Sequence, residues 1–241
     1  MNRPDAILLA GGLGTRLSTE VPGLPKALAP VAGRPFLAYL LEELQAQGLS
    51  RVILSLGHRA KQIQDFLKDY RGPLHLESCL EPEPLGTGGA IALAMKLVRS
   101  PQAFVLNADT LFRIRLESME AFHASRRAEV TLALKPMEQA DRYGLVDCEA
   151  SGRIRGFEEK RPGRGGLINA GIYLIRRSSW ETLALPERFS FERDFLEARC
   201  AQGGFYGFAE DAYFIDIGVP EDYRRAQQDF PGLFSPVQPR P

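Results

Sequence analysis

The chain has 241 residues, of which 44% are hydrophobic and 25% are charged. This balance is typical of a soluble globular protein with a sizeable core. Thirty basic residues match thirty acidic ones, so no broad surface for nucleic acid or an anionic membrane is expected. The longest apolar runs have about six residues, whereas a membrane span needs roughly 20. No signal peptide is expected at the N-terminus.

The three cysteines Cys79, Cys148 and Cys200 lie far apart and form no C-x-x-C pair. An odd number of scattered cysteines argues against a zinc site or a disulfide framework. We therefore expect a protein of the reducing cytoplasm.

The first part of the chain alternates apolar strands with amphipathic helices. Strands are predicted at residues 6–10, 52–56, 74–80 and 103–107. Helices are predicted at residues 36–47, along the apolar stripe 63–70, and at 88–98. This alternation predicts right-handed crossovers and a mostly parallel sheet. In such sheets ligands bind beyond the carboxyl ends of the strands.

The later part of the chain is richer in strands. Extended segments are predicted at residues 130–134, 145–148, 154–157, 168–175 and 213–217. Ser190 is expected to cap a helix through Cys200, and Pro220 to open a final helix at 221–229. Residues 231–241 contain four prolines and are expected to form a loose tail. No sharp linker divides the chain, so we expect one domain over 1–230.

A glycine-rich loop, Gly11-Gly12-Leu13-Gly14-Thr15-Arg16, follows the first strand. It matches neither the dinucleotide fingerprint nor the P-loop, and a plain turn is the alternative interpretation. Three glycines allow backbone amides to approach an anion closely. Arg16 adds a planar fork for phosphate oxygens, and Pro25 restricts the residue before Lys26 to an extended shape. The loop and Lys26 together predict a phosphate pocket.

Two aspartates each follow an apolar strand, Asp109 after 103–107 and Asp216 after 212–215. A carboxylate at such a place is costly unless it is capped, paired or bound to a metal. A helix cap or a turn is the ordinary interpretation of either residue alone. As a pair they suit Mg²⁺, which takes one or two carboxylates together with substrate phosphates.

The whole pattern resembles the sugar-1-phosphate nucleotidylyltransferases, from about residue 4 to about 230. The motif GG-x-GTR-L followed by P-K is met at residues 11–17 and 25–26. An apolar strand followed by x-D is met at 105–109, E-x-K at 158–160, and N-x-G-I-Y at 169–173. Segments 83–91, 141–144, 189–192 and 213–223 resemble most closely the D-glycero-α-D-manno-heptose 1-phosphate guanylyltransferases. Related mannose, glucose and N-acetylmuramate enzymes share much of this pattern.

The resemblance implies an α/β fold: a Rossmann-like three-layer α/β/α nucleotidyltransferase fold with a mostly parallel mixed sheet and a small strand-rich sugar-binding lobe. Residues 1–110 would bind mainly the nucleotide and residues 111–230 mainly the sugar phosphate. It also implies the partners GTP or another nucleoside triphosphate and a sugar 1-phosphate, with Mg²⁺ as cofactor, in a monomer or homodimer.

The resemblance also assigns roles to single residues. The catalytic set would be Arg16, Lys26 and Asp109, and Mg²⁺ would be held by Asp109 and Asp216. Nucleotide contacts would come from Leu9, Ala10, Gly11, Gly12, Gly14, Thr15, Arg16, Glu81, Gly86, Thr87 and Asp109. Sugar-phosphate contacts would come from Lys26, Tyr143, Gly144, Glu158, Lys160 and Asn169.

The expected reaction joins a sugar 1-phosphate to the α-phosphate of the triphosphate and releases pyrophosphate. The attacking phosphate is largely dianionic at neutral pH, so no general base is needed and catalysis comes from positioning and electrostatics. The carboxylate of Glu81 accepts hydrogen bonds only, which favours guanine over uracil, although backbone groups could read the base instead. A non-catalytic nucleotide-sugar sensor on the same fold is the alternative of another class.

Overall fold

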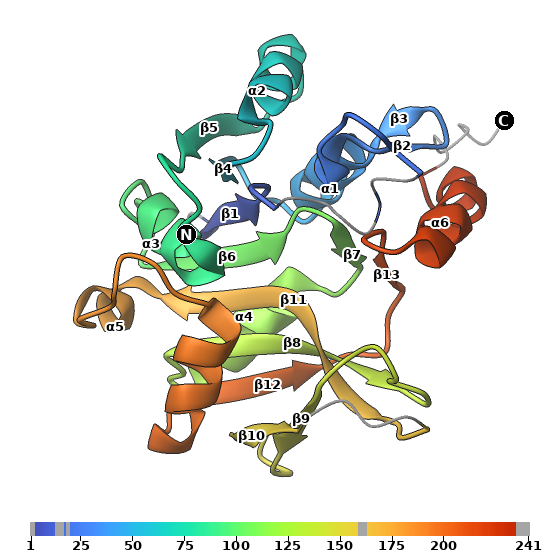
Figure 1. Ribbon diagram of the computed structural model, residues 1–241. Helices are drawn as coiled ribbons and strands as arrows, with labels where there is room; N and C mark the ends of the chain where they lie inside the picture. Colours follow the sequence, from blue (N-terminus) through green and yellow to red (C-terminus); the bar gives the residue numbers. More distant parts are fainter. Residues whose placement is uncertain (1–2, 13–16, 18–19, 159–162, 235–241) are drawn as a thin grey trace, which may run out of the picture.

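A computed structural model of the protein describes residues 3–12, 17, 20–158 and 163–234. Its centre is a nine-stranded mixed sheet (Figure 1). Four neighbouring strands of this sheet are parallel: β5 (His75–Leu80), β4 (Arg51–Leu56), β1 (Asp5–Leu9) and β6 (Gln102–Asn107). This half of the sheet confirms the parallel arrangement that the alternating strands and helices predict.

The second half of the sheet is built around the long strand β11 (Gly166–Arg176), which pairs antiparallel with β6. β11 also pairs antiparallel with β8 (Val130–Met137) and β9 (Leu145–Cys148). β10 (Ile154–Glu158) pairs antiparallel with β9, and β12 (Phe205–Ala209) runs parallel to β8. One continuous sheet therefore joins strands from both parts of the chain.

Helices cover both faces of the sheet. One core cluster takes side chains from α1 (Phe36–Ala46), α2 (Ala60–Asp69), α4 (Leu116–Ser125) and α6 (Pro220–Leu233). The other takes side chains from α3 (Gly86–Met95), α5 (Arg177–Glu181) and a π-helix at Phe191–Glu197. The strands lie between the two clusters, so the three-layer α/β/α fold class is confirmed.

Strand β1 shows why an unbroken apolar run predicts this architecture. Ala6 and Leu8 belong to one core cluster and Ile7 to the other, and all three are completely buried. Successive side chains of a strand point to opposite faces, so a strand covered on both faces is apolar throughout.

Short elements complete the described chain. β7 (Thr110–Phe112) pairs antiparallel with β13 (Phe214–Asp216), and β2 (Pro30–Val31) pairs with β3 (Arg34–Pro35). Short 3-10 turns lie at Lys26–Leu28 and Cys200–Gln202. Among the described helices, none is long and apolar enough to cross a membrane.

Several sequence-based boundaries need correction. Helix α3 begins at Gly86 rather than residue 88, and ends at Met95. The tail predicted at 231–241 is wrong for its first residues, because α6 continues to Leu233. The reason is packing: the rings of Phe230 and Phe234 lie 5.2 Å apart, and that of Phe234 lies 4.7 Å from Tyr39. Residues 235–241 lie outside the described chain.

Several further elements were not predicted at all, among them β7, α4, α5 and β12. The capping prediction for Ser190 is confirmed, since its hydroxyl accepts a hydrogen bond from the backbone N–H of Arg193. The helix that follows is a π-helix to Glu197 and then a 3-10 turn, rather than one regular helix through Cys200.

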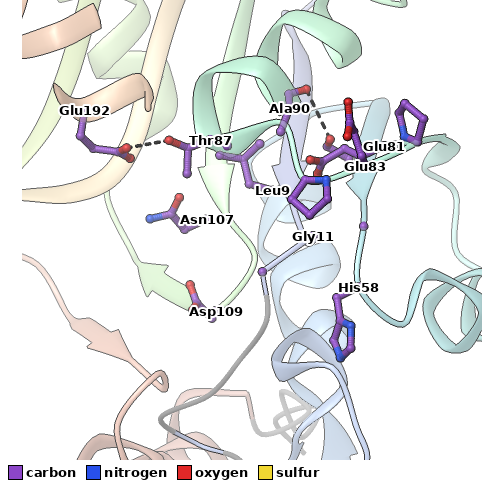
Figure 2. A pocket seen from close by; sticks show the side chains of 16 residues that line it. Leu9, Gly11, His58, Glu81, Glu83, Thr87, Ala90, Asn107, Asp109 and Glu192 are labelled. Carbon is purple, nitrogen blue, oxygen red and sulfur yellow. Dashed lines mark hydrogen bonds between the residues drawn. The ribbon is translucent and has the colours of Figure 1, made fainter. Parts of the chain in front are cut away.

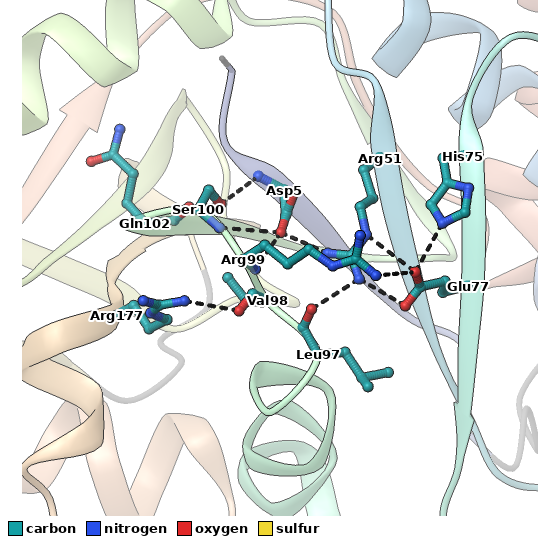
Figure 3. A network of polar contacts seen from close by, with 10 residues as sticks. All are labelled: Asp5, Arg51, His75, Glu77, Leu97, Val98, Arg99, Ser100, Gln102 and Arg177. Carbon is teal, nitrogen blue, oxygen red and sulfur yellow. Dashed lines mark hydrogen bonds and ion pairs between the residues drawn. The ribbon is translucent and has the colours of Figure 1, made fainter. Parts of the chain in front are cut away.

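A charged network ties the amino ends of β1, β4 and β5 together (Figure 3). The guanidinium of Arg51 lies 2.7 Å from the carboxylate of Asp5 and 2.7 Å from that of Glu77. It also donates to the carbonyl of Leu97 at 2.9 Å. Arg51 holds the pKa of Glu77 down to about 2, with help from His75. This network therefore holds together the amino ends of the parallel strands, at the edge of the sheet opposite their carboxyl ends.

Candidate functional site

A cavity of about 610 Å³ opens at the carboxyl ends of β1, β4 and β6, beside the start of α3 (Figure 2). This is the place where parallel sheets bind ligands. Seven of the residues predicted to bind nucleotide line it: Leu9, Gly11, Gly12, Glu81, Gly86, Thr87 and Asp109. Ala10 is not among the lining residues; it is buried, and its backbone N–H donates to Ser55 at 2.9 Å.

The pairing of β7 with β13 brings the two predicted metal aspartates together. Asp216 lies opposite Thr110 in this pairing, one residue from Asp109. The backbone N–H of Ile217 donates to the carbonyl of Asp109 at 3.0 Å. Two strands that are more than 100 residues apart in the chain thus place Asp216 beside Asp109, which lines the cavity.

Lys26 joins these aspartates from the start of a short 3-10 turn. Its ammonium lies 3.0 Å from Oδ2 of Asp109. A Cβ atom placed on Gly218 would lie 3.1 Å from that ammonium, 2.8 Å from Oδ1 of Asp216 and 3.6 Å from Oδ2 of Asp109. The three charged groups therefore gather around Gly218, whose backbone N–H donates to Asp216 at 2.8 Å.

The protonation of Asp216 reflects this crowding. Burial raises the pKa of its carboxyl, and the nearby carboxylate of Asp109 raises it further. The hydrogen bond from Gly218 and the charge of Lys26 act in the opposite direction. Two partly buried carboxylates with one ammonium leave an excess of negative charge, which a bound cation would relieve.

The donor set fits a divalent cation that shares its coordination with substrate phosphates. Within the described residues, no group of three or more His, Cys, Asp or Glu side chains could hold a metal ion. Mg²⁺ needs only one or two carboxylates because it retains waters and binds phosphate oxygens. Asp109 and Asp216 supply that number and type of ligand.

Glu81 lies at the other end of the cavity, against the first glycine of the loop. Its Oε2 accepts a hydrogen bond from the backbone N–H of Leu85 at 3.0 Å. A Cβ on Gly11 would lie 2.5 Å from its Oε1 and 3.2 Å from the backbone nitrogen of Gly57. Burial raises the pKa of the Glu81 carboxyl. Gly11 is therefore required for close packing against Glu81.

The glycines at the start of α3 pack against another segment of the chain. Gly86 has a φ of +73°, and a Cβ there would lie 2.5 Å from the carbonyl oxygen of Phe189. A Cβ on Gly88 would overlap the ring of Phe189 at 2.1 Å, and one on Gly89 would lie 2.4 Å from the carbonyl oxygen of Glu187. These glycines thus allow residues 187–189 to lie directly on α3.

Sequence analysis missed several residues that line the cavity. Glu192 follows the segment against α3 and lines the cavity, as do Asn107, His58 and Glu83. Asn107 lies within the strand motif that precedes Asp109, and Glu192 lies within a segment that carries the resemblance, so both could have been found there. His58 follows Gly57 after β4, which is also a carboxyl strand end.

Four of the predicted sugar-side residues, Tyr143, Gly144, Glu158 and Asn169, lie in or just before β9, β10 and β11 and do not line the main cavity. Asn169 accepts a hydrogen bond from the backbone N–H of Gly171 at 3.1 Å and donates to Tyr173 at 2.9 Å. Gly171 lies at a β-bulge, and a Cβ there would lie 2.5 Å from Nδ2 of Asn107. Asn169 is thus connected to the cavity wall through Gly171.

Tyr143 lines a separate cavity of about 320 Å³ beside α6. Its ring packs edge-on against Phe214 at 5.9 Å, two residues before Asp216, and burial raises its pKa to about 12. Gly144 lies against the carbonyl of Glu158, and the carboxylate of Glu158 is paired with Arg164. The predicted site residues Gly14, Thr15, Arg16 and Lys160 lie outside the described residues.

Comparisons with known proteins agree with this arrangement. Residues 5–231 match the family described as nucleotidyl transferase. The chain is 44% identical to the D-glycero-alpha-D-manno-heptose 1-phosphate guanylyltransferase of Aneurinibacillus thermoaerophilus, over 93% of this chain and 97% of that protein. The protein of the same name from Campylobacter jejuni is 42% identical, over 91% and 96%.

A solved structure is also similar. The crystal structure of HddC from Yersinia pseudotuberculosis complexed with GMP-PN superposes with a TM-score of 0.85 at 36% identity. The superposition covers 95% of this chain and 100% of that one.

Proposed function

The chain belongs to the nucleotidyl transferase family, and from that premise we propose that it transfers GMP from GTP to D-glycero-α-D-manno-heptose 1-phosphate. The products are GDP-heptose and pyrophosphate. The observation that carries this proposal is the gathering of Lys26 and Asp216 around Asp109, which lines a cavity large enough for a nucleotide. The two relatives named for this activity support the choice of sugar and base.

The reaction balances as an in-line displacement. An oxygen of the sugar phosphate forms a bond to the α-phosphorus of GTP. The bond from that phosphorus to the oxygen bridging to the β-phosphate breaks, and pyrophosphate leaves with the electron pair. The sugar phosphate is largely a dianion at neutral pH, so the protein has to position two anions rather than remove a proton.

Lys26 is assigned to the meeting point of the two substrates. Its ammonium is a compact charge that lies beside both aspartates, where it can offset repulsion between the sugar phosphate and the α-phosphate. Asp109 and Asp216 would hold Mg²⁺, which when bound supplies positive charge to the α-phosphate oxygens. Arg16 and Lys160 remain proposed ligands for the triphosphate and the sugar phosphate.

Glu81 is assigned to the guanine base. A carboxylate accepts hydrogen bonds only, and guanine presents adjacent N1–H and N2–H₂ donors. Uracil and thymine present one N3–H between two carbonyl groups, which would face a carboxylate poorly. The raised pKa of Glu81 reflects partial burial, and a buried carboxylate without donors is costly, so guanine would complete its contacts.

Leu9, Gly12, Gly86 and Thr87 are assigned to the walls of the nucleotide pocket. Tyr143, Gly144, Glu158 and Asn169 are assigned to the sugar hydroxyls. We assign the reaction to the cytoplasm, because the three cysteines are all unpaired, as expected in a reducing compartment.

A substrate panel tests the proposal. GTP, ATP, UTP and CTP are each combined with the 1-phosphates of heptose, mannose, glucose and N-acetylmuramate in the presence of Mg²⁺, and pyrophosphate release is measured. We expect GTP with heptose 1-phosphate to give the highest kcat/KM. A higher value with mannose 1-phosphate would replace the sugar assignment. Tight nucleotide binding with no pyrophosphate from any pair would identify a sensor instead of an enzyme.

A further inference from the structure

One carboxylate in the cavity has no role in the reaction described above. Glu192 lies in the first turn of the π-helix, and it lines the cavity beside Thr87 (Figure 2). The glycines Gly86 and Gly88 permit the segment before it to lie on α3, with a hydrogen bond of 3.0 Å from Gly88 to Phe189. Glu192 is therefore held at the wall by close backbone packing.

The orientation of this carboxylate is fixed by two hydroxyl groups. Thr87 donates to Oε2 of Glu192 at 2.7 Å, while the Thr87 oxygen accepts from the backbone N–H of Phe191 at 2.9 Å. Ser190 donates to the same Oε2 at 3.2 Å. Among the described residues no hydrogen bond reaches Oε1 of Glu192. A carboxylate oxygen has two acceptor sites, so Oε1 is available to a ligand.

The helix start does not need this side chain. In the first turn, the backbone N–H of Arg193 donates a hydrogen bond to the Ser190 hydroxyl at 3.3 Å. Asp194 in turn accepts from the backbone N–H of Ser190 at 2.7 Å. Capping groups of this kind satisfy the free amides of a helix N-terminus. Neither of these caps uses the Glu192 carboxylate, which accepts hydrogen bonds from Thr87 and Ser190 beside the cavity.

The position of Glu192 in the cavity determines which part of the ligand it contacts. Glu81 and Asp109 lie at opposite ends of the cavity, and Thr87 and Glu192 lie on the wall to one side of the line between them (Figure 2). If the base lies at Glu81 and the phosphates lie at Asp109, the ribose lies between them. Ribose carries two neighbouring hydroxyl groups, and an acceptor-only carboxylate is suited to them.

We propose that Glu192 accepts a hydrogen bond from a ribose hydroxyl of the bound nucleotide, so that the protein selects ribonucleotides over deoxyribonucleotides. This inference rests on the proposed function for the placement of the base and the phosphates. Thr87 is then a positioning residue, because its hydroxyl orients the carboxylate while its own oxygen is fixed by Phe191.

The test compares GTP with 2′-deoxy-GTP and 3′-deoxy-GTP, by calorimetric binding and by kcat/KM with heptose 1-phosphate. The protein, Glu192→Gln, Glu192→Ala and a control, Glu197→Gln, are measured in parallel. Glu197 lies on the same helix but is exposed. A hydrogen bond to a charged acceptor predicts a preference for GTP over one deoxynucleotide of roughly 10- to 100-fold.

We expect the preference for GTP over the deoxynucleotide to fall to roughly 1- to 3-fold in Glu192→Ala. In Glu192→Gln it should be smaller than in the parent protein, and in the control Glu197→Gln it should be unchanged. A preference that is absent in the parent protein, or unchanged in Glu192→Ala, would overturn the inference. A change confined to the KM of the sugar phosphate would overturn it too, because the carboxylate would then meet the sugar. Calorimetry measures nucleotide binding without turnover. If the protein binds GTP but releases no pyrophosphate, the proposed function is refuted, yet the comparison with the deoxynucleotides still tests the role of Glu192.

Discussion

The ammonium of Lys26 lies 3.0 Å from the carboxylate of Asp109, although 83 positions separate the two residues in the chain. Both side chains are only partly exposed, at 24% and 29%. The pair forms because the short turn that begins at Lys26 and the strand β7 after Asp109 meet beside Gly218. This contact joins the two motifs on which the proposed reaction depends.

Removal of either charge should abolish most of the activity. We expect Lys26→Ala and Asp109→Asn each to lower kcat by roughly 100- to 1000-fold, because both groups stabilise charge in the transition state. Pyrophosphate release measures the effect, and circular dichroism checks that the fold is retained. Lys61→Ala is the control, since Lys61 is 74% exposed and its ion-pair partner among the described residues is Asp65 on the same helix. Near-normal turnover in Asp109→Asn would remove this residue from the mechanism.

The contact between Gly11 and Glu81 should be needed for nucleotide binding. In Gly11→Ala the new methyl group would lie 2.5 Å from Oε1 of Glu81, so the carboxylate has to leave its place beside Leu85. We expect KM for GTP to rise by roughly 10-fold or more, with little change in Tm. Gly232→Ala is the matched control, because a Cβ there meets no atom within 4 Å. An unchanged KM for GTP would show that GTP binding does not depend on the position of the Glu81 carboxylate.

An ion pair between half-exposed Arg142 and buried Asp222 should position the loop that carries Tyr143. Arg142 donates to Asp222 at 2.5 Å, and the side chain of Asp222 is only 5% exposed. Asp222 lies in the first turn of α6, six residues after Asp216. We expect Arg142→Ala to raise KM for the sugar phosphate by roughly 10-fold and to leave KM for GTP unchanged.

The control for this pair is Arg155→Ala, because Arg155 is 62% exposed and its pair with Glu149 lies at the surface. Steady-state kinetics with each substrate varied in turn separates the two KM values. An equal rise in both would mean that Arg142 stabilises the whole site rather than the sugar loop.

The network at the far end of the sheet should contribute to stability and not to activity. Arg51→Ala would leave the carboxylate of Asp5, a residue that is 7% exposed, without its ionic partner. Breaking a buried pair from one side costs roughly 3–5 kcal/mol in the free energy of unfolding, which urea denaturation measures. The exposed pair between Lys61 and Asp65 should contribute far less, because solvent screens it. A loss of similar size in both variants would contradict the role of burial.

His123 should make the protein sensitive to acid. It is 2% exposed, its Nδ1 lies 2.8 Å from the hydroxyl of Thr131, and its Nε2 has no partner among the described residues. Burial lowers its pKa from 6.5 to about 4. The unfolded chain therefore takes up a proton near pH 6.5 and the folded chain only near pH 4, so stability falls as the pH falls through this window.

The expected loss across the window is roughly 3 kcal/mol, at about 1.4 kcal/mol for each unit of pKa difference. Denaturation at a series of pH values between 7 and 4 measures it. His123→Gln should reduce the slope, whereas His58→Gln, which replaces an exposed histidine, should keep it. An equal slope in all three proteins would assign the acid sensitivity to other groups.

The sequence predicts the strands best where both faces of a strand are buried, because such a strand is an unbroken apolar run. The apolar runs of β1, β4 and β6 were predicted because their side chains enter both core clusters. Helix α4 was missed because its buried face contains Leu116, Met119 and the polar residue His123. A histidine on a core face weakens the apolar periodicity on which such predictions depend.

The candidate site was predictable in its residues but not in its contacts. Asp109 and Asp216 were singled out from their strand ends, yet their closeness depends on two three-residue strands that pair across the chain. Of the glycines at the start of α3, Gly86 was interpreted as nucleotide-binding, and both Gly86 and Gly88 prove to lie against Phe189. Glu192 enters the cavity only through this packing, which local sequence does not encode.

One measurement tests the central claim most directly. GTP labelled with ³²P at the α-phosphate or at the γ-phosphate is incubated with heptose 1-phosphate, Mg²⁺ and the protein, and the products are separated. The account predicts that the α label enters a nucleotide-sugar, the γ label enters pyrophosphate, and neither appears with Asp109→Asn. Transfer of the γ label to the sugar, or an α label that remains in free GDP or GTP, would contradict it.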